Sequence, residues 1–237
     1  LRLLCFPYAG GGAGIFRLWP QALPESVEVV AYQPPARANR LREPPLRRVE
    51  DLVAEALSVM APMLDRPIAL FGHSIGGLVA AEAARVLSAR GRVPVHLFVS
   101  AKPMRRPSSL LHKLDDASFI TELNRRYAGV PHEIMQLPDV LELLLPGMRA
   151  DIEALETFGE VKGELTCPIS VFGGADDPAV SREDLEAWRG ATTGPCRIRV
   201  FPGGHFYIND ARDALLADVS ATLAAFARHR LGSEPAQ

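Results

Sequence analysis

Ser74 stands in a short pattern that is typical of an activated serine nucleophile. The sequence around it reads FGHSIGG (71–77), which contains Gly-x-Ser-x-Gly and lies between an apolar run and a helical pattern. A serine at such a strand-to-helix turn needs glycine two positions away on either side, because larger side chains would collide there. Gly72 and Gly76 meet this requirement, and an ordinary glycine-rich turn is the alternative. The sequence therefore predicts a strained turn that presents the Ser74 hydroxyl at the start of a helix, whose dipole favours developing negative charge.

A serine nucleophile needs a general base, and the base needs an orienting carboxylate. With this type of turn the chain order is serine, acid, histidine, with the later residues at the carboxyl ends of later strands. His205 follows two glycines in PGGHF (202–206), and we predict that it is the general base and later the general acid. The segment FGGADDP (172–178) offers two acids. We favour Asp177 over Asp176, because Pro178 biases the residue before it toward an extended conformation.

Two backbone N–H groups could stabilise the negative oxygen that such a serine creates on a carbonyl substrate. One is expected from Ile75, the residue after the nucleophile. The second is expected from the loop FPYAGGGAG (6–14), with the N–H of Ala9 as our candidate. The same glycines do not fit a dinucleotide or phosphate loop, because Ile15 occupies the last position of G-x-G-x-x-G and no Gly-Lys-Ser/Thr follows.

The remaining histidines lack the spacing of a catalytic or metal-binding set. His73 is next to Ser74, but neighbouring side chains in a tight turn point apart, so we expect it to make structural hydrogen bonds. His96 lies in an apolar run and is expected to be a paired core residue. The others have no evident partners; they are His112, His132 and His229. No H-x-x-x-H or H-x-E pattern occurs, so we expect no metal ion and no cofactor.

Short apolar runs alternate with longer helical patterns along the chain. The expected strands are Leu3–Pro7, Val27–Gln33, Ile68–Gly72, Val95–Ser100, Ile169–Gly173 and Arg197–Pro202. The expected helices cover residues 15–23, 49–64, 75–90, 181–192 and 208–230. Most of the runs lack polar alternation, as strands buried on both faces do. The rhythm predicts an α/β fold with a mainly parallel sheet flanked by helices.

Residues 104–163 interrupt this alternation. They contain no convincing strand and two helical patterns, near 115–128 and 138–158. We expect a helical lid above the sheet, with a pair of ordinary crossover helices as the alternative. The chain then divides into a core of residues 1–103 and 164–231, a lid at 104–163 and a disordered tail at 232–237.

The composition is that of an ordinary folded protein. Of 237 residues, 48% are hydrophobic and 23% are charged, and 26 basic residues against 28 acidic ones give a net charge of −2. This balance argues against global disorder and against electrostatic binding of nucleic acid. Cys5, Cys167 and Cys196 form neither a disulfide framework nor a zinc pattern, so we expect a reducing, cytoplasmic compartment. No run of about 18 apolar residues exists to cross a membrane. We expect a monomer, because no coiled-coil or large apolar stripe is evident.

Taken together, these motifs resemble the type II thioesterases that accompany nonribosomal peptide and polyketide synthases. The resemblance rests on FPYAGG (6–11), the PPAR to EPP stretch (34–45), GHSIGG (72–77), LPGMRADIEALETF (145–158), FGGADDP (172–178) and PGGHF (202–206). It implies an α/β-hydrolase fold with Ser74, Asp177 and His205 as the triad and Ala9 as an oxyanion donor. It also implies hydrolysis of acyl groups from the phosphopantetheine arm of acyl or peptidyl carrier proteins, removing wrong or stalled units.

The chain departs from that pattern at two places and leaves two functions open. Relatives usually have glycine where this chain has Ala36, and often methionine where it has Ile75. A general carboxylesterase with the same triad is one alternative, and a hydrolase fold reused for binding is another. Two basic clusters follow expected strands, and one of them could meet the pantetheine phosphate or an acidic carrier surface. The clusters are Arg37, Arg40 and Arg42, and Lys102, Arg105 and Arg106.

Overall fold

The computed structural model describes residues 1–128, 136–159, 161 and 163–231. Six strands in this part of the chain form one fully parallel sheet with the order β2-β1-β3-β4-β5-β6. The strands are β1 (Arg2–Phe6), β2 (Glu28–Ala31), β3 (Ile68–His73), β4 (His96–Ser100), β5 (Ile169–Gly174) and β6 (Cys196–Phe201). All six expected strands are therefore confirmed within two residues at each end. The predicted tail at 232–237 lies outside the described residues.

The order of the strands reverses between β1 and β3. The chain goes from β1 outward to the edge strand β2 and then returns to β3 on the other side of β1. In open parallel sheets the loops that follow two such strands separate and leave a crevice at their carboxyl ends. The loop after β1 carries Ala9 and the turn after β3 carries Ser74, so the fold itself brings these two segments to one crevice.

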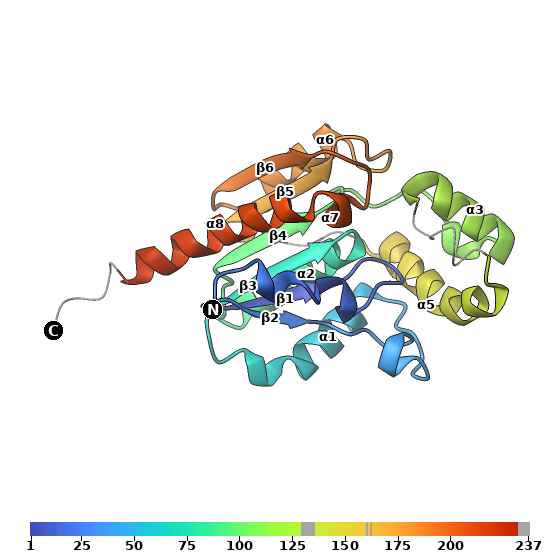
Figure 1. Ribbon diagram of the computed structural model, residues 1–237, viewed down its shortest axis with the longest axis horizontal. Helices are drawn as coiled ribbons and strands as arrows, with labels where there is room; N and C mark the ends of the chain where they lie inside the picture. The colour runs from blue at the N-terminus through green and yellow to red at the C-terminus, as the bar shows by residue number, and fades with distance from the viewer. Residues whose placement is uncertain (129–135, 160, 162, 232–237) are drawn as a thin grey trace.

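Helices cover both faces of the sheet (Figure 1). On one face, α1 (Val49–Val59) and α2 (Ile75–Ala89) pack their apolar sides against β1, β3, β4 and β5. On the other face lies α8 (Arg212–Leu231), which packs with Leu215, Leu216, Val219 and Leu223. The central strands are buried on both sides, which explains why they read as continuous apolar runs.

Several expected helices are shorter or divided. The pattern at 15–23 forms two 3-10 turns, Ala13–Phe16 and Trp19–Gln21, and the predicted α-helix there is wrong. Pro20 explains this, because it has no N–H and its ring would clash with the carbonyl four residues earlier. The last two expected helices each contain a break. The segment 181–192 contains α6 (Arg182–Glu186) followed by a 3-10 turn, and α7 (Tyr207–Asp210) precedes α8.

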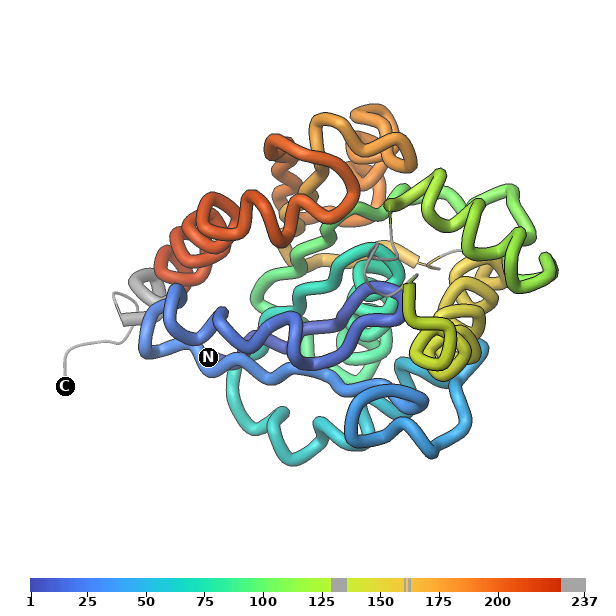
Figure 2. Tube along the Cα trace, turned by 45° about the vertical axis from the view of Figure 1, so that its right-hand side comes forward, coloured from blue at the N-terminus to red at the C-terminus, as the bar shows by residue number. Residues whose placement is uncertain are grey.

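Between β4 and β5 the chain forms α3 (Asp116–Tyr127) and α5 (Pro138–Thr157). Both lie beyond the carboxyl ends of the strands, to one side of the sheet (Figures 1 and 2). They share a small apolar cluster of their own, made of Leu111, Phe119, Leu123, Leu145, Met148 and Ile152. Residues 129–135, 160 and 162 of the expected lid lie outside the described residues.

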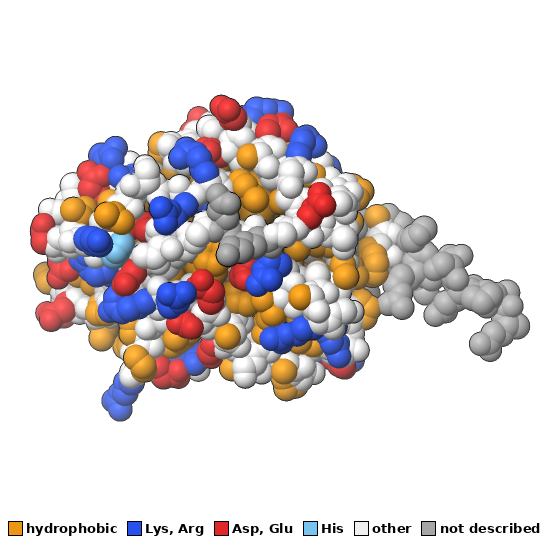
Figure 3. All heavy atoms as spheres, turned by 180° about the vertical axis from the view of Figure 1, so that it is seen from behind, with side chains coloured by type: hydrophobic (Ala, Val, Ile, Leu, Met, Phe, Trp, Pro, Cys, Tyr) orange, Lys and Arg blue, Asp and Glu red, His pale blue; other side chains and the backbone are white. Residues whose placement is uncertain are grey.

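The surface carries charges of both signs. On the side opposite to that in Figure 1, basic and acidic side chains are interspersed with apolar ones (Figure 3). This agrees with the nearly balanced net charge of −2. None of the helices in the described part of the chain is long and apolar enough to cross a membrane.

Candidate active site

Ser74 occupies a sharp turn between β3 and α2. Its backbone angles are φ 56° and ψ −123°, a conformation that L-residues avoid. A Cβ on Gly72 would lie 1.8 Å from the carbonyl oxygen of Gly76, and a Cβ on Gly76 would lie 2.2 Å from that of Phe6. The N–H of Ser74 donates to the carbonyl of Ser100 at 2.8 Å. The predicted strained turn is therefore present, and its two glycines are required by backbone contacts.

Ser74, His205 and Asp177 form a hydrogen-bonded row. The Nε2 atom of His205 lies 3.1 Å from the Oγ of Ser74, and its Nδ1 atom lies 2.8 Å from the Oδ2 of Asp177. The side chains of His205 and Asp177 are buried, being 3% and 0% exposed. A carboxylate only accepts hydrogen bonds, so Nδ1 carries the proton and Nε2 is free to accept the proton of the serine hydroxyl. Asp176, the alternative acid, is exposed and lies outside this row.

His73 supports the loop that carries His205. Its Nε2 atom donates to the carbonyl oxygen of His205 at 3.0 Å, and its Nδ1 atom lies 2.8 Å from the hydroxyl of Ser100. The hydroxyl of Tyr207 contacts the same Ser100 oxygen. Burial, followed by the neighbouring His205, lowers the pKa of His73 well below its usual value, so the ring is neutral. The expected structural role of His73 is confirmed.

His96 is also paired, as expected. Its Nε2 atom lies 2.9 Å from the hydroxyl of Ser170 on the neighbouring strand. Burial lowers the pKa of His96 to about 4. Among the described residues, no group of three or more His, Cys, Asp or Glu side chains is placed to hold a metal ion.

The two expected oxyanion donors, Ala9 and Ile75, lie in the loop after β1 and at the start of α2. Ile75 is the first residue of α2, so its N–H has no carbonyl partner within the helix. Ala9 and Ser74 line the same small cavity together with His205. The turn after Ala9 is closed by a bond from the N–H of Gly11 to the carbonyl of Tyr8 at 2.9 Å.

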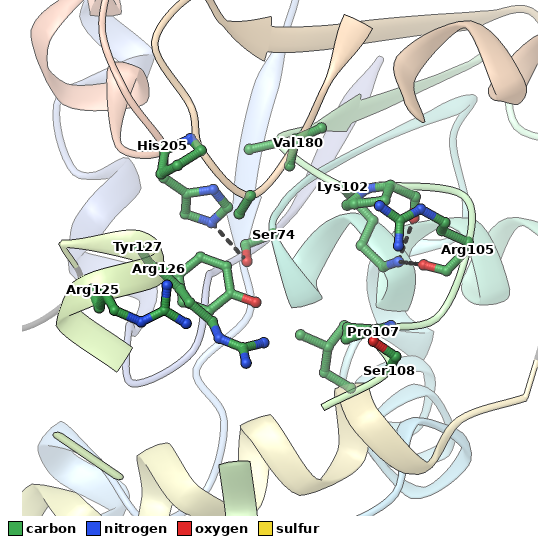
Figure 4. Close-up of a pocket in the computed structure, with 15 residues that line it drawn as sticks. Ser74, Lys102, Arg105, Pro107, Ser108, Arg125, Arg126, Tyr127, Val180 and His205 are labelled. Atoms are coloured by element: carbon green, nitrogen blue, oxygen red, sulfur yellow. Dashed lines mark hydrogen bonds between the residues drawn. The ribbon is translucent and has the colours of Figure 1, made fainter. Parts of the chain in front are cut away.

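Two cavities meet at Ser74 and His205. The larger, of about 300 Å³, opens between α3 and the loop after β4 (Figure 4). The smaller, of about 20 Å³, is mostly apolar, with Leu123, Met148, Ile152 and Phe206 among its lining residues. Tyr127, at the end of α3, borders both cavities, and its ring centre lies 4.8 Å from that of His205. No motif in the sequence pointed to Tyr127.

Basic residues surround the larger cavity. Lys102 and Arg105 lie on one side and Arg125 and Arg126 of α3 on the other (Figure 4). Lys102 is buried, and burial lowers its pKa to about 8. Arg105 is mostly exposed and bonds to Asp184 at 2.8 Å. Part of the second basic cluster of the sequence therefore borders the site.

Two residues of the first basic cluster, Arg37 and Arg40, form ion pairs within the protein. Arg37 is buried and forms an ion pair with Asp151 of α5, with nitrogen–oxygen distances of 2.7 and 3.1 Å. Arg40 is paired with Glu43 and Glu55. The hypothesis that this cluster meets a phosphate or a carrier is therefore wrong for these two arginines, because their charges are already neutralised within the protein.

Comparison with known proteins places this arrangement in a family. A family model described as thioesterase domain matches residues 1–223. The chain belongs to the thioesterase family. It is 38% identical over 225 residues to thioesterase PikA5 of Streptomyces venezuelae, covering 93% of this chain and 80% of the relative.

Solved structures agree with this assignment. RedJ, a thioesterase from the prodiginine biosynthetic pathway of Streptomyces coelicolor, superimposes with a TM-score of 0.87 at 38% identity, covering 94% of this chain and 90% of RedJ. The type II thioesterase BorB from the borrelidin biosynthetic cluster superimposes with a TM-score of 0.83 at 34% identity, covering 94% and 91% of the two chains. The protein is accordingly a type II thioesterase, a serine hydrolase with an α/β-hydrolase fold.

Proposed function

We propose that this thioesterase hydrolyses acyl groups from the phosphopantetheine arm of acyl or peptidyl carrier proteins, with Ser74, His205 and Asp177 as its catalytic triad. The observation that carries the proposal is the buried hydrogen-bonded row of these three residues, which opens onto a cavity of about 300 Å³. RedJ and BorB, which share the fold over most of their length, come from biosynthetic clusters for natural products. Such systems carry their intermediates as carrier thioesters.

In the first half of the reaction, the Oγ of Ser74 attacks the thioester carbonyl while His205 takes the hydroxyl proton. The oxyanion that forms is held by the N–H groups of Ala9 and Ile75, and one such donor is worth about 10²–10³ in rate. The carbon–sulfur bond then breaks, and the pantetheine thiolate takes the proton from His205 and leaves as a thiol, which returns His205 to its neutral form. A thiolate is a good leaving group at neutral pH, so His205 matters most in activating the nucleophile.

In the second half, a water molecule attacks the acyl ester on Ser74. His205 takes a proton from the water, and the same oxyanion donors hold the second tetrahedral intermediate. The carbon–oxygen bond to Ser74 breaks, the free acid leaves, and Ser74 regains its proton from His205. Asp177 keeps the ring oriented and stabilises its positive charge in both halves.

The two cavities suggest how a thioester would lie. The small apolar cavity beside Ala9 suits the acyl group, and the larger, more polar cavity suits the pantetheine arm. A space of about 20 Å³ holds little more than one water molecule, so a bound acyl group must displace the side chains of α3 or α5. We propose that residues 104–163 act as a lid over both.

Charge at the entrance supports a carrier partner. Arg105 and Arg125 are exposed at the larger cavity, with side chains 70% and 63% exposed, and each is paired with one acid, Asp184 or Glu122. With Lys102 and Arg126 on the same cavity, basic side chains still outnumber these acids. Such residues would attract an acidic carrier surface and raise the rate of association at low salt. Because carrier-bound intermediates are made inside the cell, we propose a cytoplasmic place of action.

The proposal competes with a general carboxylesterase that uses the same residues. The test compares an acyl carrier thioester with an oxygen ester of the same acyl group, across short and long chains. We expect at least tenfold higher kcat/KM on the carrier thioester. Brisk cleavage of the oxygen ester without carrier activity would favour the esterase. A fluorophosphonate probe that fails to label Ser74 would favour a non-catalytic binding protein.

A further inference from the structure

A buried ion pair joins three separate parts of the chain beside the active site. Arg37 lies in the loop after β2, and Asp151 lies on α5; their side chains are 7% and 4% exposed. The loop that carries Arg37 packs directly against α5, since a Cβ on Gly147 would lie 3.1 Å from the carbonyl oxygen of Ala36. Figure 2 shows this loop in light blue beside α5 in yellow. The triad does not use this pair.

Both members of the pair also bind the loop after β1. The N–H of Gly10 donates to Oδ2 of Asp151 at 2.8 Å, and a terminal nitrogen of Arg37 donates to the carbonyl of Gly11 at 3.0 Å. Gly10 adopts a φ of +74°, and a Cβ there would lie 2.7 Å from Met148 of α5. The two residues immediately after Ala9 are therefore each held by a charged group: Gly10 by the carboxylate of Asp151, and Gly11 by the guanidinium of Arg37.

This arrangement has an energetic cost. Ala36 and Ala38, on either side of Arg37, both have positive φ values of 65° and 48°, which is unfavourable for alanine. Removing a carboxylate and a guanidinium from water is also costly, and well-packed apolar residues often stabilise a fold at least as well as a buried ion pair. Stability is therefore a weak explanation for the pair, and strained backbone of this kind is often found where a functional position is held.

We propose that Arg37 and Asp151 are positioning residues that fix the backbone N–H of Ala9 in the oxyanion hole; this rests on the proposed role of Ala9. An oxyanion donor is effective only when it lies about 2.7–3.1 Å from the place where the negative oxygen forms. The pair sets that distance by holding the next two residues, Gly10 and Gly11, against α5. Its loss lowers the rate of the chemical step and leaves thioester binding nearly unchanged.

The test is Asp151→Asn, compared with Glu156→Gln as a matched control. Glu156 lies five residues further along the same helix and is equally buried; its partners are Ser109, Leu111 and His112, none of which belongs to the loop after β1. For Asp151→Asn we expect kcat on an acyl carrier thioester to fall about 10–100-fold, within the range for loss of an oxyanion donor, with KM within about threefold. For Glu156→Gln we expect kcat within about threefold, although its melting temperature also falls.

A double variant, Arg37→Met with Asp151→Leu, removes both charges and keeps the test valid if a single variant does not fold. We expect it to fold and to retain the loss in kcat. Wild-type kcat in the folded double variant, or equal losses in Asp151→Asn and Glu156→Gln, would overturn the proposal.

The rate at which a fluorophosphonate labels Ser74 separates this proposal from the proposed function. If the wild type is labelled but does not cleave carrier thioesters, the substrate assignment fails. Labelling at least tenfold slower in Asp151→Asn than in Glu156→Gln would then still support the positioning role, and equal rates would overturn it. If Ser74 of the wild type is not labelled and no thioester is cleaved, the positioning role is overturned with the function.

Discussion

Both oxygens of the Asp177 carboxylate are occupied: Oδ2 lies 2.8 Å from the Nδ1 of His205, and Oδ1 accepts the N–H of Ala179 at the same distance. Pro178 has no N–H, so Ala179 is the first residue after the acid that can donate. The carboxylate is therefore fixed in orientation from its own loop, and it fixes the tautomer of His205 in turn.

Exchanging this carboxylate for an amide should disable the base without disturbing the fold. For Asp177→Asn we expect kcat to fall by about 10³–10⁴, because an amide can donate to Nδ1 and so favours the wrong tautomer. The matched control is Asp176→Asn in the same loop, which should stay within about twofold. Kinetics on an acyl carrier thioester, with circular dichroism to verify folding, would measure both. Equal losses in the two variants would contradict the assignment of Asp177.

Stability should decrease in mild acid. Burial lowers the pKa of His96 from its ordinary 6.5 to about 4, and that of His73 well below 6.5. The unfolded chain therefore binds more protons than the folded chain below pH 6.5, so the free energy of unfolding should fall from about pH 6.5 toward pH 4. Urea unfolding at a series of pH values measures this slope.

The variant His96→Gln tests the contribution of His96 separately from that of His73. It removes a titrating ring and keeps a side chain that can bond to Ser170. We expect it to lower stability at pH 7 and to flatten the dependence between pH 6.5 and pH 4. An unchanged slope would show that His96 does not contribute to the effect.

Tyr127 should limit the length of the acyl group. Its ring lies against His205 and lines both the narrow apolar cavity and the larger one. In Tyr127→Ala the two spaces merge, so we expect the ratio of kcat/KM for octanoyl to that for acetyl carrier thioesters to rise about tenfold. Tyr127→Phe keeps the ring and should leave the ratio within about twofold. If both variants change the ratio equally, the hydroxyl matters rather than the volume.

The sheet and the hydrogen-bonded row could be predicted because their signals are local. Buried parallel strands give continuous apolar runs, and the turn at Ser74 needs glycines at fixed positions. The choice of Asp177 depended on the proline that follows it, and the structure places that carboxylate on His205. The expected helix at 15–23 is divided because Pro20 has no N–H to donate and its ring interrupts a continuous helix.

Other features could not be read from the sequence because their partners are distant. Arg37 and Asp151 are separated by 114 positions, and only the folding of α5 against the loop after β2 brings them together. The sequence alone therefore does not show that Arg37 is buried and paired. Tyr127 belongs to no motif, and its place beside His205 depends on the docking of α3 over the ends of the strands.

The most direct test of the account is acid release from an acyl carrier protein by the wild type and by Ser74→Ala. We expect the substitution to lower kcat by at least 10³, with an unchanged circular dichroism spectrum. An acylated form of the wild type, its mass increased by the acyl group at Ser74, should be detectable after rapid quenching. Carrier thioester hydrolysis that continues at the wild-type rate in Ser74→Ala would contradict the central claim.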